Sequence, residues 1–216
     1  MPRVLVFASG SKDGGGSGFR NLVLRSRGEN PDLIADIVGV VSNHKDGGVR
    51  RHAEELGVPF EYFGGPYQAR TYRRIVNDFE AEWVALSGWL KLVRGLNPRT
   101  TFNIHPGPLP EFGGEGMYGH KVHEAVIAAF KRGEITKSAV TMHFVTDRYD
   151  EGPTFFRFPV PIYEDDTPGS LQQRVNEFEH QWQPIITSCV VNSQISWNGL
   201  DPKSLIVSSR YQEYLP

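Results

Sequence analysis

"RVLVFASGSKDGGGSGFRNLVLRSR" (residues 3–27) contains three different patterns in succession. Residues 3–9 form a continuous apolar run, which is typical of a strand buried on both faces of a parallel sheet. A glycine-rich loop, residues 10–18, follows, and residues 19–27 then carry apolar side chains at helical spacing. A buried strand that leads through a short loop into a helix predicts the first unit of a doubly wound α/β fold.

The same alternation continues through the first half of the chain. Further strands are expected at residues 36–42, 58–63, 83–88 and 101–105, and further helices at 49–57 and 67–79. Such short connections predict a mostly parallel, Rossmann-like sheet, in which ligands bind beyond the carboxyl ends of the strands.

The second half has a different pattern. A helix is expected at residues 119–134, and two strands at 138–145 and 154–162 are joined by a turn short enough to make them an antiparallel pair. The last helix, 167–194, begins with a capping Thr and a Pro at its first position, but Pro184 is expected to break or kink it. The tail that follows shows no regular pattern.

The composition argues against several classes of function. The formal charge of −2 over 216 residues gives no reason to expect a nucleic-acid partner, and no apolar run approaches the roughly 20 residues of a membrane span. The single cysteine, Cys189, excludes an internal disulfide and lies in an apolar stretch, which predicts a core residue and not a nucleophile. A reducing, cytoplasmic location is therefore expected.

The stretch "FNIHPGPLP" (102–110) ends an expected strand with two polar side chains. Asn103 and His105 share one face of that strand, because side chains two residues apart point the same way. The prolines that follow stiffen the chain. An amide can donate to an oxyanion and an imidazole can move a proton, so this is a candidate catalytic pair; a buried pair that ties down a loop is the alternative.

The turn "RYDEGP" (148–153) contains a further candidate for the catalytic site, the carboxylate of Asp150. Asp150 could be ordinary turn chemistry. If the turn folds over the end of the preceding strand, Asp150 meets His105, and the carboxylate would then raise the pKa of the imidazole and keep it protonated.

The loop at residues 10–18 resembles an anion cradle, since glycines allow a phosphate to approach backbone N–H groups at a helix N-terminus. It matches neither the P-loop nor the G-x-G-x-x-G dinucleotide pattern. A mobile surface loop is the alternative.

A metal site could be imagined from His120, His123 and His143 together with His105 and Asp150. No cysteine or HExxH pattern supports such a site, and no metal is predicted.

Several stretches together resemble one family. "SGWLKLV" (87–93), "NIHPGPLP" (103–110), "HFVTDRYDEGP" (143–153) and "VPIYEDDTPGSLQQRV" (160–175), followed by "EH" at 179–180, are similar in order and spacing to the phosphoribosylglycinamide formyltransferases (glycinamide ribonucleotide transformylases) of the formyltetrahydrofolate-dependent formyltransferase superfamily. The similarity extends over about residues 3–195. Methionyl-tRNA formyltransferases and formyltetrahydrofolate deformylases share some motifs but carry further domains.

The resemblance implies specific roles. Asn103, His105 and Asp150 would be catalytic. Folate contacts would be made by Leu90, Lys91, Leu92, Val93, Val145 and Thr146, and contacts to the substrate phosphate and ribose by Gly15, Gly16, Ser17, Gly18 and Glu179. The family's phosphate loop is a short Gly-Asn-Gly-Ser-Asn, whereas the loop here is longer, and Lys91 stands where an Arg is common.

The implied reaction moves a formyl group from 10-formyltetrahydrofolate, a co-substrate, to the primary amine of 5'-phosphoribosylglycinamide in purine biosynthesis. Asn103 and protonated His105 would stabilise the oxyanion, with Asp150 supporting His105, and no metal would take part. Residues 1–216 would form one domain with a phosphate-binding half (1–100), a catalytic and folate-binding half (101–195) and an irregular tail (196–216).

Small molecules are the expected partners, with no nucleic acid or membrane, and the chain is expected to be a monomer or homodimer. Three alternatives stay open: a formyltetrahydrofolate hydrolase or another formyltransferase using the same trio, a nucleotide-binding oxidoreductase, and a non-catalytic binding module. The missing dinucleotide fingerprint argues against the oxidoreductase.

Overall fold

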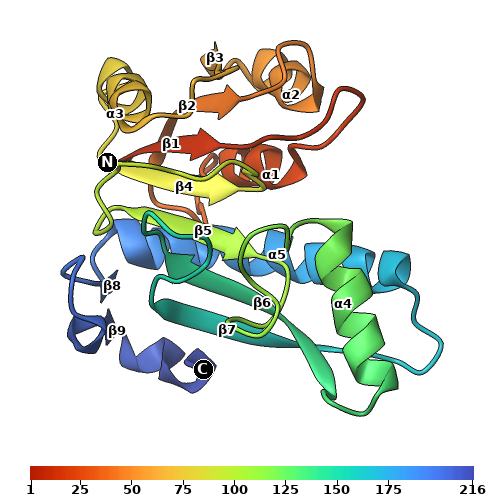
Figure 1. Ribbon diagram of the computed structural model, residues 1–216. Coiled ribbons are helices and arrows are strands. Elements are labelled where there is room, and N and C mark those ends of the chain that lie inside the picture. Colours follow the sequence, from red (N-terminus) through yellow and green to blue (C-terminus); the bar gives the residue numbers. More distant parts are fainter.

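A computed structural model describes residues 1–216 and contains a seven-stranded sheet in the order β3-β2-β1-β4-β5-β6-β7 (Figure 1). The strands are β1 (Arg3–Phe7), β2 (Asp36–Ser42), β3 (Phe60–Tyr62), β4 (Trp83–Ser87), β5 (Thr101–His105), β6 (Lys137–Phe144) and β7 (Thr154–Pro161). Strands β1 to β5 pair in parallel, and β6 and β7 are antiparallel to their neighbours. The predicted doubly wound α/β fold with an antiparallel pair is confirmed.

Five helices cover the sheet: α1 (Ser17–Arg25), α2 (Gly48–Leu56), α3 (Ala69–Asp78), α4 (His120–Lys131) and α5 (Pro168–Val191). β1 shows why the first apolar run is continuous. Val4 and Val6 belong to the larger core cluster, which also contains residues of α1, α2, α4 and α5, whereas Leu5 and Phe7 belong to a smaller cluster with residues of α3. Successive side chains of β1 are therefore buried on opposite faces of the sheet.

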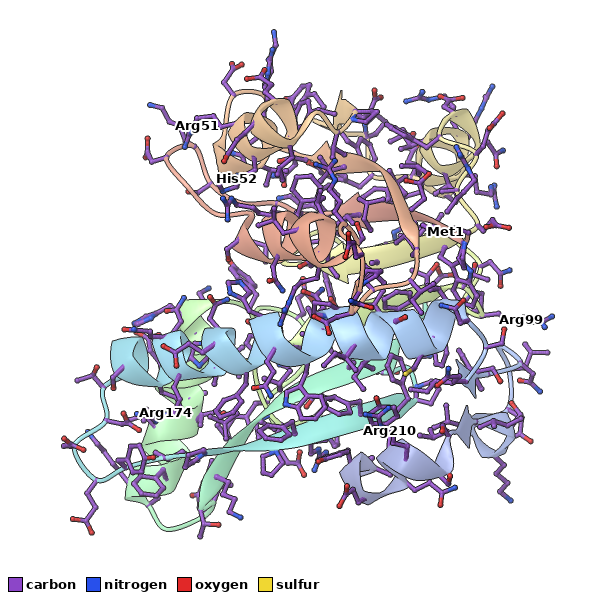
Figure 2. The ribbon with its side chains drawn as sticks, turned by 180° about the vertical axis from the view of Figure 1, so that it is seen from behind. Met1, Arg51, His52, Arg99, Arg174 and Arg210 are labelled. Atoms are coloured by element: carbon purple, nitrogen blue, oxygen red, sulfur yellow. The ribbon has the colours of Figure 1, made fainter.

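The expected break at Pro184 is wrong. α5 continues through Pro184 to Val191, and Figure 2 shows it crossing the sheet beside α1. A proline has no N–H, so the carbonyl oxygen of His180 loses its helical partner. The side-chain amide of Asn21 on α1 donates to that oxygen at 2.7 Å. The neighbouring helix thus supplies the missing donor. The capping Thr167, in contrast, is confirmed, and it forms a capping box with Ser170.

The end of the chain, expected to be irregular, contains short ordered elements. β8 (Ile195–Ser196) pairs with β9 (Ile206–Val207), and two 3₁₀ helices, η1 (Pro202–Ser204) and η2 (Ser209–Tyr214), flank β9. The ring of Tyr214 lies 5.3 Å from that of Phe156 and 5.5 Å from that of Trp182. Packing against β7 and α5 orders this segment, and its pieces are too short to show a period in the sequence. None of the helices is long and apolar enough to span a membrane.

Candidate active site

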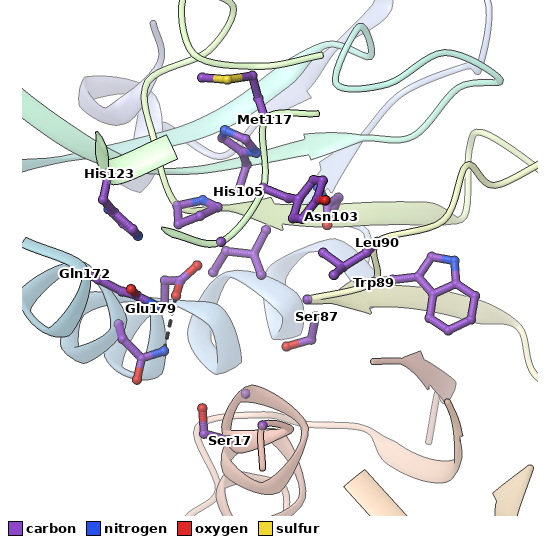
Figure 3. A pocket seen from close by; sticks show the side chains of 18 of the residues that line it. Ser17, Ser87, Trp89, Leu90, Asn103, His105, Met117, His123, Gln172 and Glu179 are labelled. Carbon is purple, nitrogen blue, oxygen red and sulfur yellow. Dashed lines mark hydrogen bonds between the residues drawn. The ribbon is translucent and has the colours of Figure 1, made fainter. Parts of the chain in front are cut away.

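A cavity of about 910 Å³ lies where the carboxyl ends of β1, β4 and β5 meet (Figure 3). Its wall includes parts of the glycine loop after β1, the segment Ser87–Leu90 after β4, and Asn103–Pro106 at the end of β5. The segment Gly114–Gly119, together with one face of α5, closes it from the other side. Three stretches that are distant in sequence therefore converge on one edge of the sheet, as the parallel topology requires.

β5 presents Asn103 and His105 to the cavity, and Ile104, which belongs to the larger core cluster, also lines part of it. The amide Nδ2 of Asn103 lies 3.1 Å from Nε2 of His143 on β6. Nδ1 of His143 lies 2.8 Å from the carbonyl oxygen of Phe144 and donates to it, so Nε2 is free to accept from Asn103. One N–H of the Asn103 amide is thereby engaged, and the second is free.

Asp150 reaches both imidazoles. Its Oδ2 lies 3.8 Å from Nδ1 of His105, and its Oδ1 lies 3.4 Å from Nε2 of His143. The backbone N–H of Gly114 donates to Oδ2 at 2.9 Å, and Asp150 itself adopts a left-handed φ of 54°. Burial opposes the charge on this carboxyl, but its interactions with the two histidines lower its pKa below the usual value. The predicted meeting of Asp150 and His105 is present.

The expected influence of Asp150 on the pKa of His105 is present, but it is not the largest influence. Burial lowers the pKa of His105 below its ordinary 6.5, and this effect exceeds the opposing influence of Asp150. The His105 side chain is only 4% exposed. The loss of hydration therefore destabilises the charged imidazolium more than the Asp150 carboxylate, at 3.8 Å, stabilises it. Nε2 of His105 donates to the carbonyl oxygen of Phe112 at 2.8 Å. The other ring nitrogen of His105, Nδ1, faces Asp150.

The glycine loop forms the opposite wall. Gly15 and Gly16 have φ angles of 81° and 86°, and Gly16 caps α1 without a side chain. The first helical hydrogen bond runs from the N–H of Arg20 to the carbonyl of Gly16, so the N–H groups of Gly16, Ser17 and Gly18 have no acceptor in the protein. All four residues from Gly15 to Gly18 line the cavity. Free N–H groups at a helix N-terminus are suited to bind an anion.

α5 presents a row of polar side chains to the cavity, of which the sequence analysis found only Glu179. The others are Gln172, Gln173, Asn176, His180 and Gln183. Burial raises the pKa of Glu179 to about 7, and its one hydrogen bond is donated by Nδ2 of Asn176 at 3.3 Å. Helical spacing could have revealed this row, because it lies opposite the apolar positions of the same helix.

His123 on α4 also lines the cavity, and sequence reasoning had considered it only as a metal ligand. Its side chain is 2% exposed and its Nδ1 has no hydrogen-bond partner. Burial lowers the pKa of His123 to about 4. His120, on the same helix, is exposed and lies beside Gln172 instead. The structure holds no group of three or more His, Cys, Asp or Glu side chains positioned for a metal.

The six expected folate residues do not all line one cavity. Leu90 lines the cavity, and Leu92 lines an adjoining groove of about 520 Å³ with Arg94, Arg148 and Tyr149. The other four lie outside both. The ammonium of Lys91 lies over the ring of Tyr67, Val93 is buried in the smaller core cluster, Val145 packs against that cluster, and the hydroxyl of Thr146 accepts from the N–H of Arg148.

Comparison with known proteins agrees with this arrangement. The model of the formyl transferase family matches residues 2–187. The chain is 34% identical over 208 residues to phosphoribosylglycinamide formyltransferase, chloroplastic, of Vigna unguiculata, covering 90% of this chain and 62% of the relative. It is 30% identical over 196 residues to phosphoribosylglycinamide formyltransferase of Bacillus subtilis, covering 86% of this chain and 93% of the relative.

A solved structure, glycinamide ribonucleotide transformylase 1 of Symbiobacterium toebii, shares the fold with a TM-score of 0.80 at 24% identity, covering 97% of this chain and 95% of that one. The chain therefore belongs to the formyl transferase family. Within that family its similarity is to the phosphoribosylglycinamide formyltransferases, which confirms the resemblance found in the motifs. The chain spans a little over three fifths of the length of the Vigna relative.

Proposed function

We propose that this protein transfers the formyl group of 10-formyltetrahydrofolate to the primary amine of 5'-phosphoribosylglycinamide, a step of purine biosynthesis. One observation carries the proposal: a single cavity joins a helix N-terminus with free N–H groups, at Ser17 and Gly18, to the half-buried amide of Asn103 and the buried imidazole of His105. Figure 3 shows Ser17 on one side of the cavity and Asn103 and His105 on the other, so a substrate with a phosphate at one end and an amine at the other would contact both walls.

The residues of β5 perform the chemistry. Bound 10-formyltetrahydrofolate supplies a formyl carbon that is already activated towards an amine. Asn103 donates its free N–H to the formyl oxygen as negative charge develops there. Neutral His105 accepts the amine proton at Nδ1, and Asp150 then stabilises the imidazolium. Protonated His105 becomes a second, charged donor for the oxygen. As the tetrahedral intermediate collapses, the bond from the formyl carbon to the folate nitrogen breaks, and His105 returns the proton to that nitrogen. The expected oxyanion role is thus kept, but the proton on His105 comes from the substrate.

The remaining contacts follow from the walls of the cavity. Backbone N–H groups of residues 15–18 bind the phosphate, and Glu179 accepts hydrogen bonds from ribose hydroxyls. On the folate side, Leu90 and Leu92 border the cavity and its adjoining groove, which supports apolar contacts there. Residues 1–100 and 101–195 each contribute to the site within one domain. A cytoplasmic location, supported by the single cysteine, belongs to the same proposal.

The test separates a transferase from a hydrolase. Folate absorbance is followed with enzyme alone and with enzyme plus phosphoribosylglycinamide. We expect consumption of 10-formyltetrahydrofolate to be at least about a hundredfold faster with the amine present, because positioned reactants gain several orders of magnitude over chance encounter. Equal rates in the two samples would refute the transferase and favour the hydrolase.

A further inference from the structure

One buried amide at the cavity has a donor group that nothing in the protein satisfies. Gln183 on α5 is 1% exposed, and its Oε1 accepts from the hydroxyl of Ser87 at 3.3 Å. No acceptor within the protein is bonded to its Nε2, yet the residue lines the cavity. Because Gln183 lines the cavity, its Nε2 is available to donate to a ligand bound there.

The amide lies beside the first turn of α1. A Cβ atom placed on Gly18 would be 2.3 Å from the hydroxyl oxygen of Ser87 and 3.3 Å from Oε1 of Gln183. Position 18 is therefore without a side chain because Ser87 and Gln183 occupy the space that one would need. These two residues stand directly against the helix N-terminus whose N–H groups have no acceptor.

The positive potential beside Gln183 favours an anionic ligand. The N-terminus of a helix carries partial positive charge, and an amide N–H adds a further donor. Glu179, four residues earlier on α5, lies about 6 Å away along the helix axis and would contact the less charged part of the ligand. α5 would thereby contact the ligand at two points one turn apart, with the anionic end at Gln183.

We propose that Nε2 of Gln183 donates a hydrogen bond to the phosphate group of the substrate, and that Ser87 is a positioning residue that holds the amide in this orientation. The identity of the anion as the phosphate of phosphoribosylglycinamide rests on the proposed function. The donor set itself, an amide beside free helix N–H groups, stands independently of it.

Binding of inorganic phosphate to the protein without other ligands, measured by calorimetry, tests the donor set. We expect Gln183→Met, which keeps the length of the side chain, to raise the phosphate Kd at least about tenfold, as for a lost hydrogen bond to a charged group. Gln183→Glu, which replaces a donor by an anion, should abolish binding. Gln181→Met, the same change at an exposed position of α5, should leave Kd unchanged. Unchanged phosphate binding in folded Gln183→Met and Gln183→Glu proteins would overturn the proposal.

Steady-state kinetics then identify which part of the substrate Gln183 contacts. With phosphoribosylglycinamide, Gln183→Met should raise KM about tenfold while kcat and the KM for folate change less than about twofold. With the glycinamide riboside, which lacks the phosphate, the variant and the wild type should have equal KM values. An equal loss with both amines would place the contact elsewhere and refute the assignment.

If Gln183→Met does not fold, Ser87→Ala takes its place, with an expected severalfold rise in phosphate Kd. Normal phosphate binding without turnover of phosphoribosylglycinamide would refute the proposed function alone.

Discussion

The two walls of the cavity are built by opposite means. On the loop side, residues 15–18 offer backbone N–H groups, and Ser17 contributes the only side chain larger than a hydrogen. On the β5 side, Asn103, His105 and Asp150 offer side-chain groups, each held by a neighbour at hydrogen-bond distance.

The difference explains how far each wall can vary. A backbone cradle needs glycines at the positions of positive φ, but not a particular number of residues, so a loop longer than the family's pattern still ends in a free helix N-terminus. Under the proposed function the β5 wall depends on the identity of three side chains, since their functional groups would do the chemistry. Changes on the β5 wall should affect the reaction, and changes on the loop wall should affect binding.

The largest effect is expected on the β5 wall. His105→Ala, Asn103→Ala and Asp150→Ala should each fold normally and lose about two orders of magnitude or more in kcat, since each removes a group that acts in the transition state. The three losses should be strongly non-additive because the residues act as one unit. Steady-state kinetics measure the effect, with His120→Ala, an exposed histidine, as the matched control. Near-normal turnover by a folded His105→Ala protein would refute the mechanism.

The second effect concerns the loop wall. A Cβ on Gly16 would lie 2.9 Å from Cγ2 and 3.1 Å from Cα of Val49, at a φ of 86° that side chains rarely adopt. Gly16→Val should displace the loop and raise the KM for phosphoribosylglycinamide about tenfold or more, with the KM for folate nearly unchanged. Gly28→Val is the control, because Gly28 has φ of 98° but nothing within 4 Å of its Cβ position. An equal loss for both substrates would show that the loop supports the whole site.

A third prediction concerns the support of the α5 wall and affects stability. Asn21→Ala leaves the carbonyl of His180 without a partner and should lower the free energy of unfolding by about 1–3 kcal/mol. Chemical denaturation measures this change. In a Pro184→Ala background the helix regains its own N–H donor, so the cost of Asn21→Ala should shrink. An undiminished cost there would mean that Asn21 stabilises α5 in some other way.

The smallest effect is a pH dependence. Burial raises the pKa of Glu179 from 4.5 to about 7, so the folded protein holds this proton more tightly than the unfolded chain does. The stability contributed by this group is therefore complete below about pH 4.5 and is lost as the pH rises through about 7. Glu179 is only half-buried, so solvent weakens this effect, and relative to Glu179→Gln the wild-type Tm should fall by about 2–4 °C between pH 4.5 and 7.5. Parallel Tm profiles of the two proteins would contradict the raised pKa.

Local patterns in the sequence determined most of the architecture. The alternation of buried strands and helices follows from side-chain periodicity, which is a property of each segment alone. The same holds for the pairing of Asn103 with His105 on one face of β5, because residues two apart in a strand point the same way. Parallel topology then placed the glycine loop, Leu90 and the end of β5 at one edge.

Only the tertiary structure decided the properties that depend on distant partners. The continuity of α5 through Pro184 rests on Asn21, which is 159 residues away from His180 along the chain. The lowered pKa of His105 reflects how completely other segments enclose it, and the packing of Val93 into the smaller core cluster likewise depends on distant segments. Each of these properties depends on which distant residues pack around a buried group. An unpaired donor or charge is costly where water is excluded, and a local sequence pattern does not show which residues will exclude it.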